Sequence, residues 1–260
     1  MIKLGVNIDH IAVLREARKI NDPDPVEALG IVKRAGGEQI TIHLREDRRH
    51  IHDEDAERIV QMSALPVNLE CSTDEEIIDI ICRLKPHRAT LVPERREEVT
   101  TEGGLDIMSY EDRVSAAIEK LHAHEIEVSL FIDPDLETIT RADALGAEWI
   151  ELHTGTYANI YAMLHSNLLH THHSIEDLEL PRHTLQTKLA ESLEGLKGAA
   201  DHARSLGLKV AAGHGLNYQN VKEIVEIDAI EELNIGQSII ARSLFSGLEA
   251  AVREMKALLG

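Results

Sequence analysis

Titratable side chains lie at or near the ends of short apolar segments that are far apart in this sequence. His43 and Glu70 belong to two such segments, and Glu151 and His214 to two more. Imidazole titrates near neutral pH, and burial can raise the pKa of a carboxyl group toward that range, so these groups can exchange protons. Burying them together without pairing is costly, which favours a functional explanation over a stabilising one. We interpret the four as general acid–base catalysts; the alternative is a polar network that only satisfies itself.

Each of these residues also has a simpler explanation. His43 could be hydrogen-bonded to a carboxylate of a neighbouring strand, and Glu70 could form an ion pair with Arg45. His214 lies in Ala-Gly-His-Gly-Leu at 212–216, where the glycines allow a ligand to approach the backbone closely or simply form a tight turn.

Possible anion-binding groups occur near the same segments. Gly215, Gly236 and Gln237 follow the seventh and eighth apolar segments, and a glycine before a helix suits phosphate binding. Arg15 and Arg18 are three residues apart and either face one anion together or lie on a solvated helix face.

The elements that must position these side chains follow a regular pattern. Eight apolar segments alternate along the chain with helix-like segments, and in most of them polar residues occupy every second position. This pattern predicts an α/β fold, a (β/α)₈ TIM barrel with its active site at the C-terminal ends of the strands. The segments are 3–9, 39–45, 66–70, 88–93, 127–133, 148–153, 208–214 and 232–236.

Helices and two irregular segments fill the intervals. The loop 94–106 is a candidate lid over the site. We expect residues 157–187 to form a long loop inserted after the sixth strand; it holds five of the 15 histidines and is a solvated or interface loop, or else a metal site. Helices are expected at 25–36, 53–62 with Asp53 as N-cap, 73–84, 110–124, 135–145, 188–206, 217–226 and 237–259.

Composition limits the class of protein. A chain of 260 residues with 43% hydrophobic residues and no linker fits one barrel domain, 1–260. The net charge of −19 argues against a nucleic-acid partner and against an anionic membrane surface. We see no signal peptide and no continuous apolar stretch of membrane-spanning length, and expect a cytoplasmic protein.

Eight motifs follow one another along the chain. They are Gly-Val-Asn-Ile-Asp-His-Ile-Ala (5–12), His-Leu-Arg-Glu-Asp-Arg-Arg-His (43–50), Asn-Leu-Glu (68–70), Leu-Val-Pro-Glu with Glu-Val-Thr-Thr-Glu-Gly-Gly-Leu-Asp (91–94, 98–106), Val-Ser-Leu-Phe-Ile-Asp (128–133), Ile-Glu-Leu-His-Thr-Gly (150–155), Ala-Gly-His-Gly-Leu (212–216) and Glu-Leu-Asn-Ile-Gly (232–236). Together they closely resemble the pyridoxine 5′-phosphate synthase family. The resemblance implies a (β/α)₈-barrel enzyme of vitamin B6 biosynthesis, a transferase-type synthase that condenses 3-amino-2-oxopropyl phosphate with 1-deoxy-D-xylulose 5-phosphate. The products are pyridoxine 5′-phosphate, phosphate and water. It implies no metal, no organic cofactor, and an octamer built from dimers.

The resemblance also implies roles for single residues. His43 and Glu70 match proton acceptors, His214 matches a proton donor, and Glu151 matches a group that stabilises the transition state. Contacts to the amino-ketone phosphate are implied for Asn7, Arg18, Gly215 and Gly236. Contacts to the deoxyxylulose phosphate are implied for Asp9, His10, Arg45, His50 and Thr100.

The sequence departs from the family pattern at two places, and two other classes of protein stay open. Gln237 stands where the family usually has His, so it can donate to a phosphate without carrying positive charge. The segment 157–187 is longer than expected by roughly twenty residues. The alternatives are a metal-dependent barrel hydrolase or aldolase acting on a sugar phosphate, and a non-catalytic barrel that serves in assembly.

Overall fold

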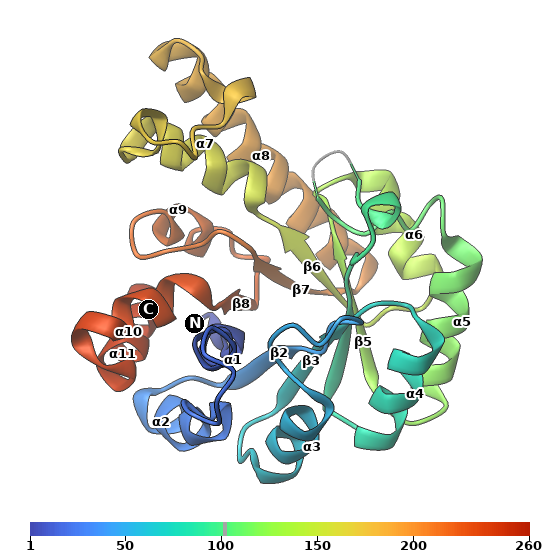
Figure 1. Cartoon of the computed structure of the whole chain (residues 1–260). Helices are drawn as coiled ribbons and strands as arrows, with labels where there is room; N and C mark the ends of the chain where they lie inside the picture. Colours follow the sequence, from blue (N-terminus) through green and yellow to red (C-terminus); the bar gives the residue numbers. More distant parts are fainter. Residues whose placement is uncertain (101–102) are drawn as a thin grey trace.

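Eight parallel strands close into a barrel, which confirms the predicted fold (Figure 1). The computed structural model of the chain describes residues 1–100 and 103–260. Each strand pairs with the next in sequence, and the last pairs with the first. The strands are β1 (Lys3–Asn7), β2 (Gln39–His43), β3 (Val67–Cys71), β4 (Arg88–Leu91), β5 (Glu127–Ile132), β6 (Trp149–His153), β7 (Lys209–Gly213) and β8 (Glu232–Ile235).

Helices surround the barrel and follow the strands in sequence (Figure 1). Their apolar faces pack against the outer side chains of the strands, and together these form one large core. The helices are α1 (Asp9–Glu16), α2 (Ala28–Ala35), α3 (Asp53–Met62), α4 (Glu75–Leu84), α5 (Glu111–His122), α6 (Leu136–Ala144), α7 (Gly155–His165), α8 (Arg182–Leu206), α9 (Val221–Val225), α10 (Gln237–Ser246) and α11 (Leu248–Leu258). Short 3₁₀ turns lie at η1 (Pro25–Glu27), η2 (Arg96–Glu98), η3 (Leu168–His170) and η4 (Glu176–Leu178).

Alternation along the strands separates the apolar outer layer from a polar lumen. On β2, Ile40 and Ile42 are fully buried in the outer core, whereas the Thr41 hydroxyl donates across the lumen to Asn234 Oδ1 at 3.1 Å. The ladder between β2 and β3 makes His43 and Glu70 direct register partners. The proximity of these two residues therefore follows from the backbone.

The N-terminal half of the lumen contains a buried polar network. Arg88 of β4 forms an ion pair with Glu232 of β8, and both side chains are 4% exposed. Its guanidinium also donates to Gln39 Oε1 at 2.9 Å. None of these residues is among the four titratable groups proposed from the sequence. The C-terminal half is different, because it opens into a cavity.

The segment 157–187 is not a long loop, contrary to our expectation. Helix α7 occupies its first part, η3 and η4 follow, and α8 begins at Arg182 instead of residue 188. The result is a helical projection that extends beyond the barrel (Figure 1). It is held by a separate small core of Ile160, Met163, Leu164 and Leu185. The spacing of the first three is helical, and packing against α8 stabilises the helix.

Three further boundaries differ from the expected ones. The N-cap of helix α3 is His52, whose main-chain N–H donates to Asp55 Oδ2 at 2.9 Å, so Asp53 is the first helical residue. The helix expected over 217–226 is only α9. The helix expected over 237–259 is two helices, because Gly247 has a φ of +79°.

Candidate active site

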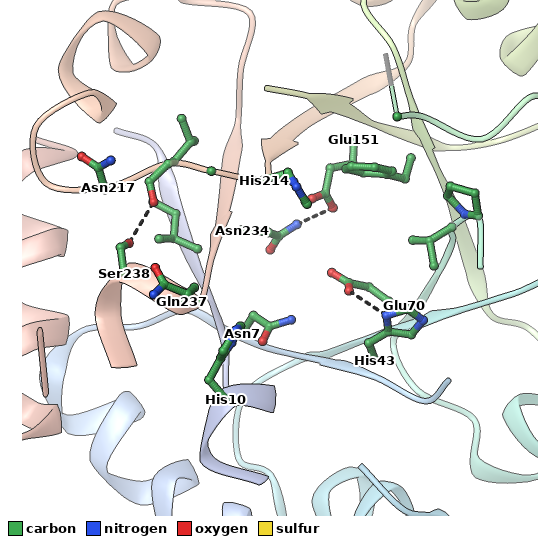
Figure 2. Close-up of a pocket in the computed structure, with 18 of the residues that line it drawn as sticks. Asn7, His10, His43, Glu70, Glu151, His214, Asn217, Asn234, Gln237 and Ser238 are labelled. Carbon is green, nitrogen blue, oxygen red and sulfur yellow. Dashed lines mark hydrogen bonds and ion pairs between the residues drawn. The ribbon is translucent and has the colours of Figure 1, made fainter. Parts of the chain in front are cut away.

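A cavity of about 640 Å³ opens at the C-terminal ends of the strands. All four proposed catalytic residues line it, together with six of the proposed binding residues (Figure 2). The lining includes His43, Glu70, Glu151, His214, Asn7, His10, Arg45, Gly215, Gly236 and Gln237. The fold therefore brings together side chains from six different strand ends.

His43 lies between two carboxylates. Its Nε2 is 2.8 Å from Glu94 Oε1, and its Nδ1 is 3.9 Å from Glu70 Oε2, the contact drawn in Figure 2. The main-chain N–H of His43 donates to Asp9 Oδ1 at 2.9 Å. The ion pair between Glu70 and Arg45 that we weighed from the sequence is not the one observed, since Arg45 pairs with Asp47 and lies 3.7 Å from Glu94.

Glu70 and Glu151 are carboxyl groups suited to holding a proton near neutral pH. Burial raises the pKa of Glu70 well above its usual value, and the charges of Glu151 and Asp9 add to this effect. Burial raises the pKa of Glu151 to about 7, although a hydrogen bond from Asn234 Nδ2 at 2.7 Å opposes the shift. The positive charge of Arg88 also acts to lower the pKa of both groups. Such a pair can act as an acid and a base in one site.

His214 reaches the cavity through a turn and not through strand alternation. Strand β7 ends at Gly213, whose position faces Glu151 in the lumen, so His214 would point outward in a continued strand. Instead His214 has a φ of +78°, and its ring packs against His153 with a centroid separation of 5.0 Å. Burial and the neighbouring His153 lower the pKa of His214, so it is largely neutral at pH 7.

The ends of β7 and β8 form a backbone cradle beside the cavity. Gly236 precedes α10, and a Cβ there would come within 3.0 Å of Asn7, so the close approach of β1 and β8 requires glycine. Gly215 has a φ of +83°. The first N–H groups of a helix have no acceptor within it, so the start of α10 at Gln237 and Ser238 suits an anion.

Four proposed binding residues do not line the cavity. Asp9 is buried beneath it, where it accepts from Asn7 Nδ2 at 2.9 Å and holds His43. His50 lies next to the His43 ring with a centroid separation of 6.2 Å. The Thr100 hydroxyl donates to Asp133. Arg18 is exposed after the end of α1 and is not one of the lining residues.

The shared anion site proposed for Arg15 and Arg18 is wrong for Arg15. The Arg15 guanidinium is buried and donates to both carboxylate oxygens of Asp55, at 2.8 and 2.7 Å. It also donates to the His50 carbonyl oxygen at 2.8 Å. These partners hold Arg15 between α1 and α3, whereas Arg18 is exposed on the turn after α1.

Sequence reasoning missed several polar residues around the cavity. Glu94 directly follows the fourth strand segment, but we assigned it to the loop. Asn234 received no role from the sequence, although it lines the cavity and donates to Glu151. The Nδ1 of His153 lies 3.1 Å from Asp133 Oδ1, and only the three-dimensional packing brings this pair next to His214.

The raised pKa of Glu151 should make the free energy of unfolding depend on pH. The native carboxyl has a pKa of about 7, whereas an unfolded glutamate has about 4.3. Between these values the native state retains a proton that the unfolded chain has released, so this group lowers stability as pH rises through the interval. We expect Glu151→Gln, which stays neutral and can still accept from Asn234, to raise the free energy of unfolding at pH 8 by about 2–3 kcal/mol. Urea unfolding at pH 5.5 and pH 8 measures this, and an equal gain at both values would contradict it.

In the part of the chain that the structure describes, no helix is long and apolar enough to span a membrane. Across residues 1–100 and 103–260, no three His, Cys, Asp or Glu side chains cluster in a way that suits a metal ion.

Comparison with known proteins gives one consistent family. The model of the family described as pyridoxal phosphate biosynthesis protein PdxJ matches residues 4–260. A protein of a Nitratiruptor species is 67% identical over 258 residues, which cover 99% of this chain and 97% of the relative. A protein of a Sulfurovum species is 65% identical over 256 residues, covering 98% and 99%. Both are named pyridoxine 5′-phosphate synthase.

Solved structures share the fold at low identity. Thiamine phosphate pyrophosphorylase from Pyrococcus furiosus is 14% identical, with a TM-score of 0.59 over 99% of this chain and 95% of that one. A dimeric phosphoribosylanthranilate isomerase from Thermotoga maritima, studied as monomers, is 13% identical, with a TM-score of 0.58 over 100% and 98%. These similarities concern the barrel fold alone.

A closed barrel whose strand ends gather imidazoles and carboxyl groups around one cavity defines a (β/α)₈-barrel enzyme equipped for acid–base chemistry. The family model covers nearly the whole chain, and the two relatives are about two-thirds identical to it. The chain belongs to the pyridoxal phosphate biosynthesis protein PdxJ family.

Proposed function

We propose that this protein is a pyridoxine 5′-phosphate synthase that condenses 3-amino-2-oxopropyl phosphate with 1-deoxy-D-xylulose 5-phosphate. The observation that carries the proposal is the 54–67% identity, across nearly the whole chain, to relatives of that name. The cavity supports it, because it is lined by three imidazoles and two carboxyl groups. Its volume of about 640 Å³ lies within the range of small-molecule sites.

The reaction moves protons at every stage, so one site needs several acid and base groups. An amine condenses with a carbonyl, water and phosphate leave, and a carbon–carbon bond closes the ring. His43 and Glu70 are the proton acceptors, and His214 is the proton donor. Glu151 stabilises the transition state. The pKa values of the two carboxyl groups are raised and that of His214 is lowered, so the site contains groups that exchange protons over different ranges of pH.

The two substrates each carry a phosphate that must be bound. Asn7, Gly215, Gly236 and Gln237 form the site for the amino-ketone phosphate at the start of α10. Arg45 and His10, which line the cavity, bind deoxyxylulose phosphate, with Asp9, His50 and Thr100 supporting that side. Arg18 does not line the cavity within one chain. We propose that it contacts the amino-ketone phosphate only because its position matches the family motif.

Assembly and location follow the same family inference. The protein forms a homo-octamer built from dimers, and it acts in the cytoplasm on small phosphorylated substrates. Its partners include neither nucleic acid nor membrane, in keeping with the net charge of −19.

The segment 94–106 acts as a lid that shields the reactive imine from water. Val99 and Gly103 line the cavity, and Asp133 accepts from Gly104 N at 3.1 Å; residues 101 and 102 lie outside the described residues. We expect both substrates together to slow tryptic cleavage after Arg95 and Arg96 relative to cleavage elsewhere in the chain. Equal cleavage rates with and without substrates would argue against closure.

Mixing the purified protein with both phosphates tests the proposed function directly. We expect pyridoxine phosphate absorbance and inorganic phosphate to appear together, and neither with one substrate alone. If neither product forms across pH 6–9, the proposed function is wrong.

Chelation separates this proposal from a metal-dependent barrel enzyme. Because the proposed acids and bases are side chains of the chain itself, we expect EDTA to leave the rate of phosphate release unchanged. A loss of activity that added Zn²⁺ or Mn²⁺ restores would favour the metal-dependent hydrolase or aldolase instead.

A further inference from the structure

A carboxylate outside the cavity lining holds the far side of His43. Glu94 Oε1 lies 2.8 Å from His43 Nε2, and the Glu94 side chain is 3% exposed. Glu94 itself is not among the residues that line the cavity, whereas His43 and Glu70 are. Glu94 therefore contacts the imidazole on the edge opposite to the one that faces Glu70.

The protein fixes Glu94 in this position. Its second oxygen, Oε2, accepts the Glu46 main-chain N–H at 2.9 Å and lies 3.7 Å from Arg45 Nη2. Burial alone would raise the pKa of Glu94, but the hydrogen bonds from His43 and Glu46 together lower it below its usual value. Glu94 is consequently an ionised carboxylate at neutral pH and can only accept hydrogen bonds.

An acceptor at Nε2 determines the tautomer of a neutral imidazole. When Nε2 carries the hydrogen, Nδ1 has a free lone pair. The groups that face His43 are Glu70 from β3, Glu94 after β4, Asp9 from α1, Arg45 and His50. Among them, only Glu94 is within hydrogen-bond distance of a ring nitrogen.

We propose that Glu94 is a positioning residue that keeps the proton of neutral His43 on Nε2, so that Nδ1 is free to take the substrate proton. When Nδ1 gains that proton, the ring becomes an imidazolium with a hydrogen on each nitrogen, and Glu94 stabilises its positive charge at Nε2. The proton leaves again from Nδ1, and Glu94 stays ionised throughout. This inference rests on the proposed function and on the assignment of His43 as a proton acceptor.

Glu94→Gln tests the inference because the amide has only one correct orientation. Its oxygen must face the Glu46 N–H, which turns its NH₂ group toward His43 Nε2. That NH₂ group donates to Nε2, so the hydrogen of neutral His43 moves to Nδ1 and blocks the base. We expect kcat to fall on the order of 10²-fold, with KM for both substrates within about two-fold. The acid limb of the kcat–pH profile should also move to lower pH, because the imidazolium loses its counter-charge.

Glu75→Gln is the matched control. It removes the same charge from an exposed side chain at the start of α4, outside the segment 94–106, and should leave kcat and the pH profile unchanged. An equal fall in both variants would overturn the inference, as would wild-type kcat and pH profile in Glu94→Gln. Absence of product from the wild-type protein would instead overturn the proposed function.

Glu94→Asp tests the positioning role of Glu94 if the Glu94→Gln protein does not fold. It keeps the charge but withdraws the carboxylate by one methylene, so we expect a kcat about ten-fold lower with the acid limb at its wild-type pH. Wild-type kcat in a folded Glu94→Asp protein would overturn the inference.

Discussion

Replacing His43 with asparagine is expected to lower kcat for pyridoxine 5′-phosphate formation by about 10²- to 10⁴-fold, the usual contribution of a general base. Asparagine is similar in size and can still donate to Glu94, but it cannot take up a proton near neutral pH. KM should change little, because the anion sites proposed at Arg45 and at the start of α10 stay in place. Steady-state phosphate release at saturating substrates measures the effect.

His183→Asn is the appropriate control, since His183 is exposed on α8 and does not line the cavity. It should behave as the wild type. If a folded His43→Asn protein turned over at the wild-type rate, and Glu70→Gln did so too, the non-catalytic barrel would become the better explanation of the cavity.

Replacing Arg88 with methionine should lower the free energy of unfolding by about 3–5 kcal/mol. Arg88 and Glu232 form a buried ion pair in the lumen, and Arg88 also lies over the Trp149 ring at 4.2 Å from its centroid. Methionine fills a similar volume but leaves the Glu232 carboxylate buried without its counter-charge, although Gln39 Nε2 still donates to it at 2.8 Å. Urea unfolding at pH 7 gives the difference.

The double variant Arg88→Met with Glu232→Leu provides the control. It removes both charges, so much of the lost stability should return. A double variant as unstable as the single one would mean that lost packing, and not the unpaired charge, causes the effect.

Much of the barrel and part of the site could be predicted, because strand alternation determines which side chains face the helices and which face the lumen. Ile40 and Ile42 had to face the helices, which placed His43 toward the lumen beside Glu70. The same rule does not explain His214, since alternation after Gly213 points outward and a positive φ brings the ring back. For that residue only the flanking glycines and the family motif indicated the cavity.

Other features depend on contacts that local patterns do not contain. Glu94 lies beyond the end of β4, where alternation no longer applies, and its partner is 51 residues away. Arg15 and Arg18 are three residues apart, as in a pair on one helix face, but Arg15 forms a buried ion pair with Asp55 of α3. In the projection after β6, the polar and histidine-rich composition obscured the helical spacing of Ile160, Met163 and Leu164.

The register between β2 and β3 has a consequence for preorganisation. His43 and Glu70 sit opposite each other in a hydrogen-bonded ladder, within a sheet that has no free edge along which a strand could slip. The main chain thus fixes the positions from which the two side chains extend, and under the proposed function substrates arrive at two proton acceptors that need no rearrangement of the sheet. Little reorganisation energy would then be spent before the first proton moves.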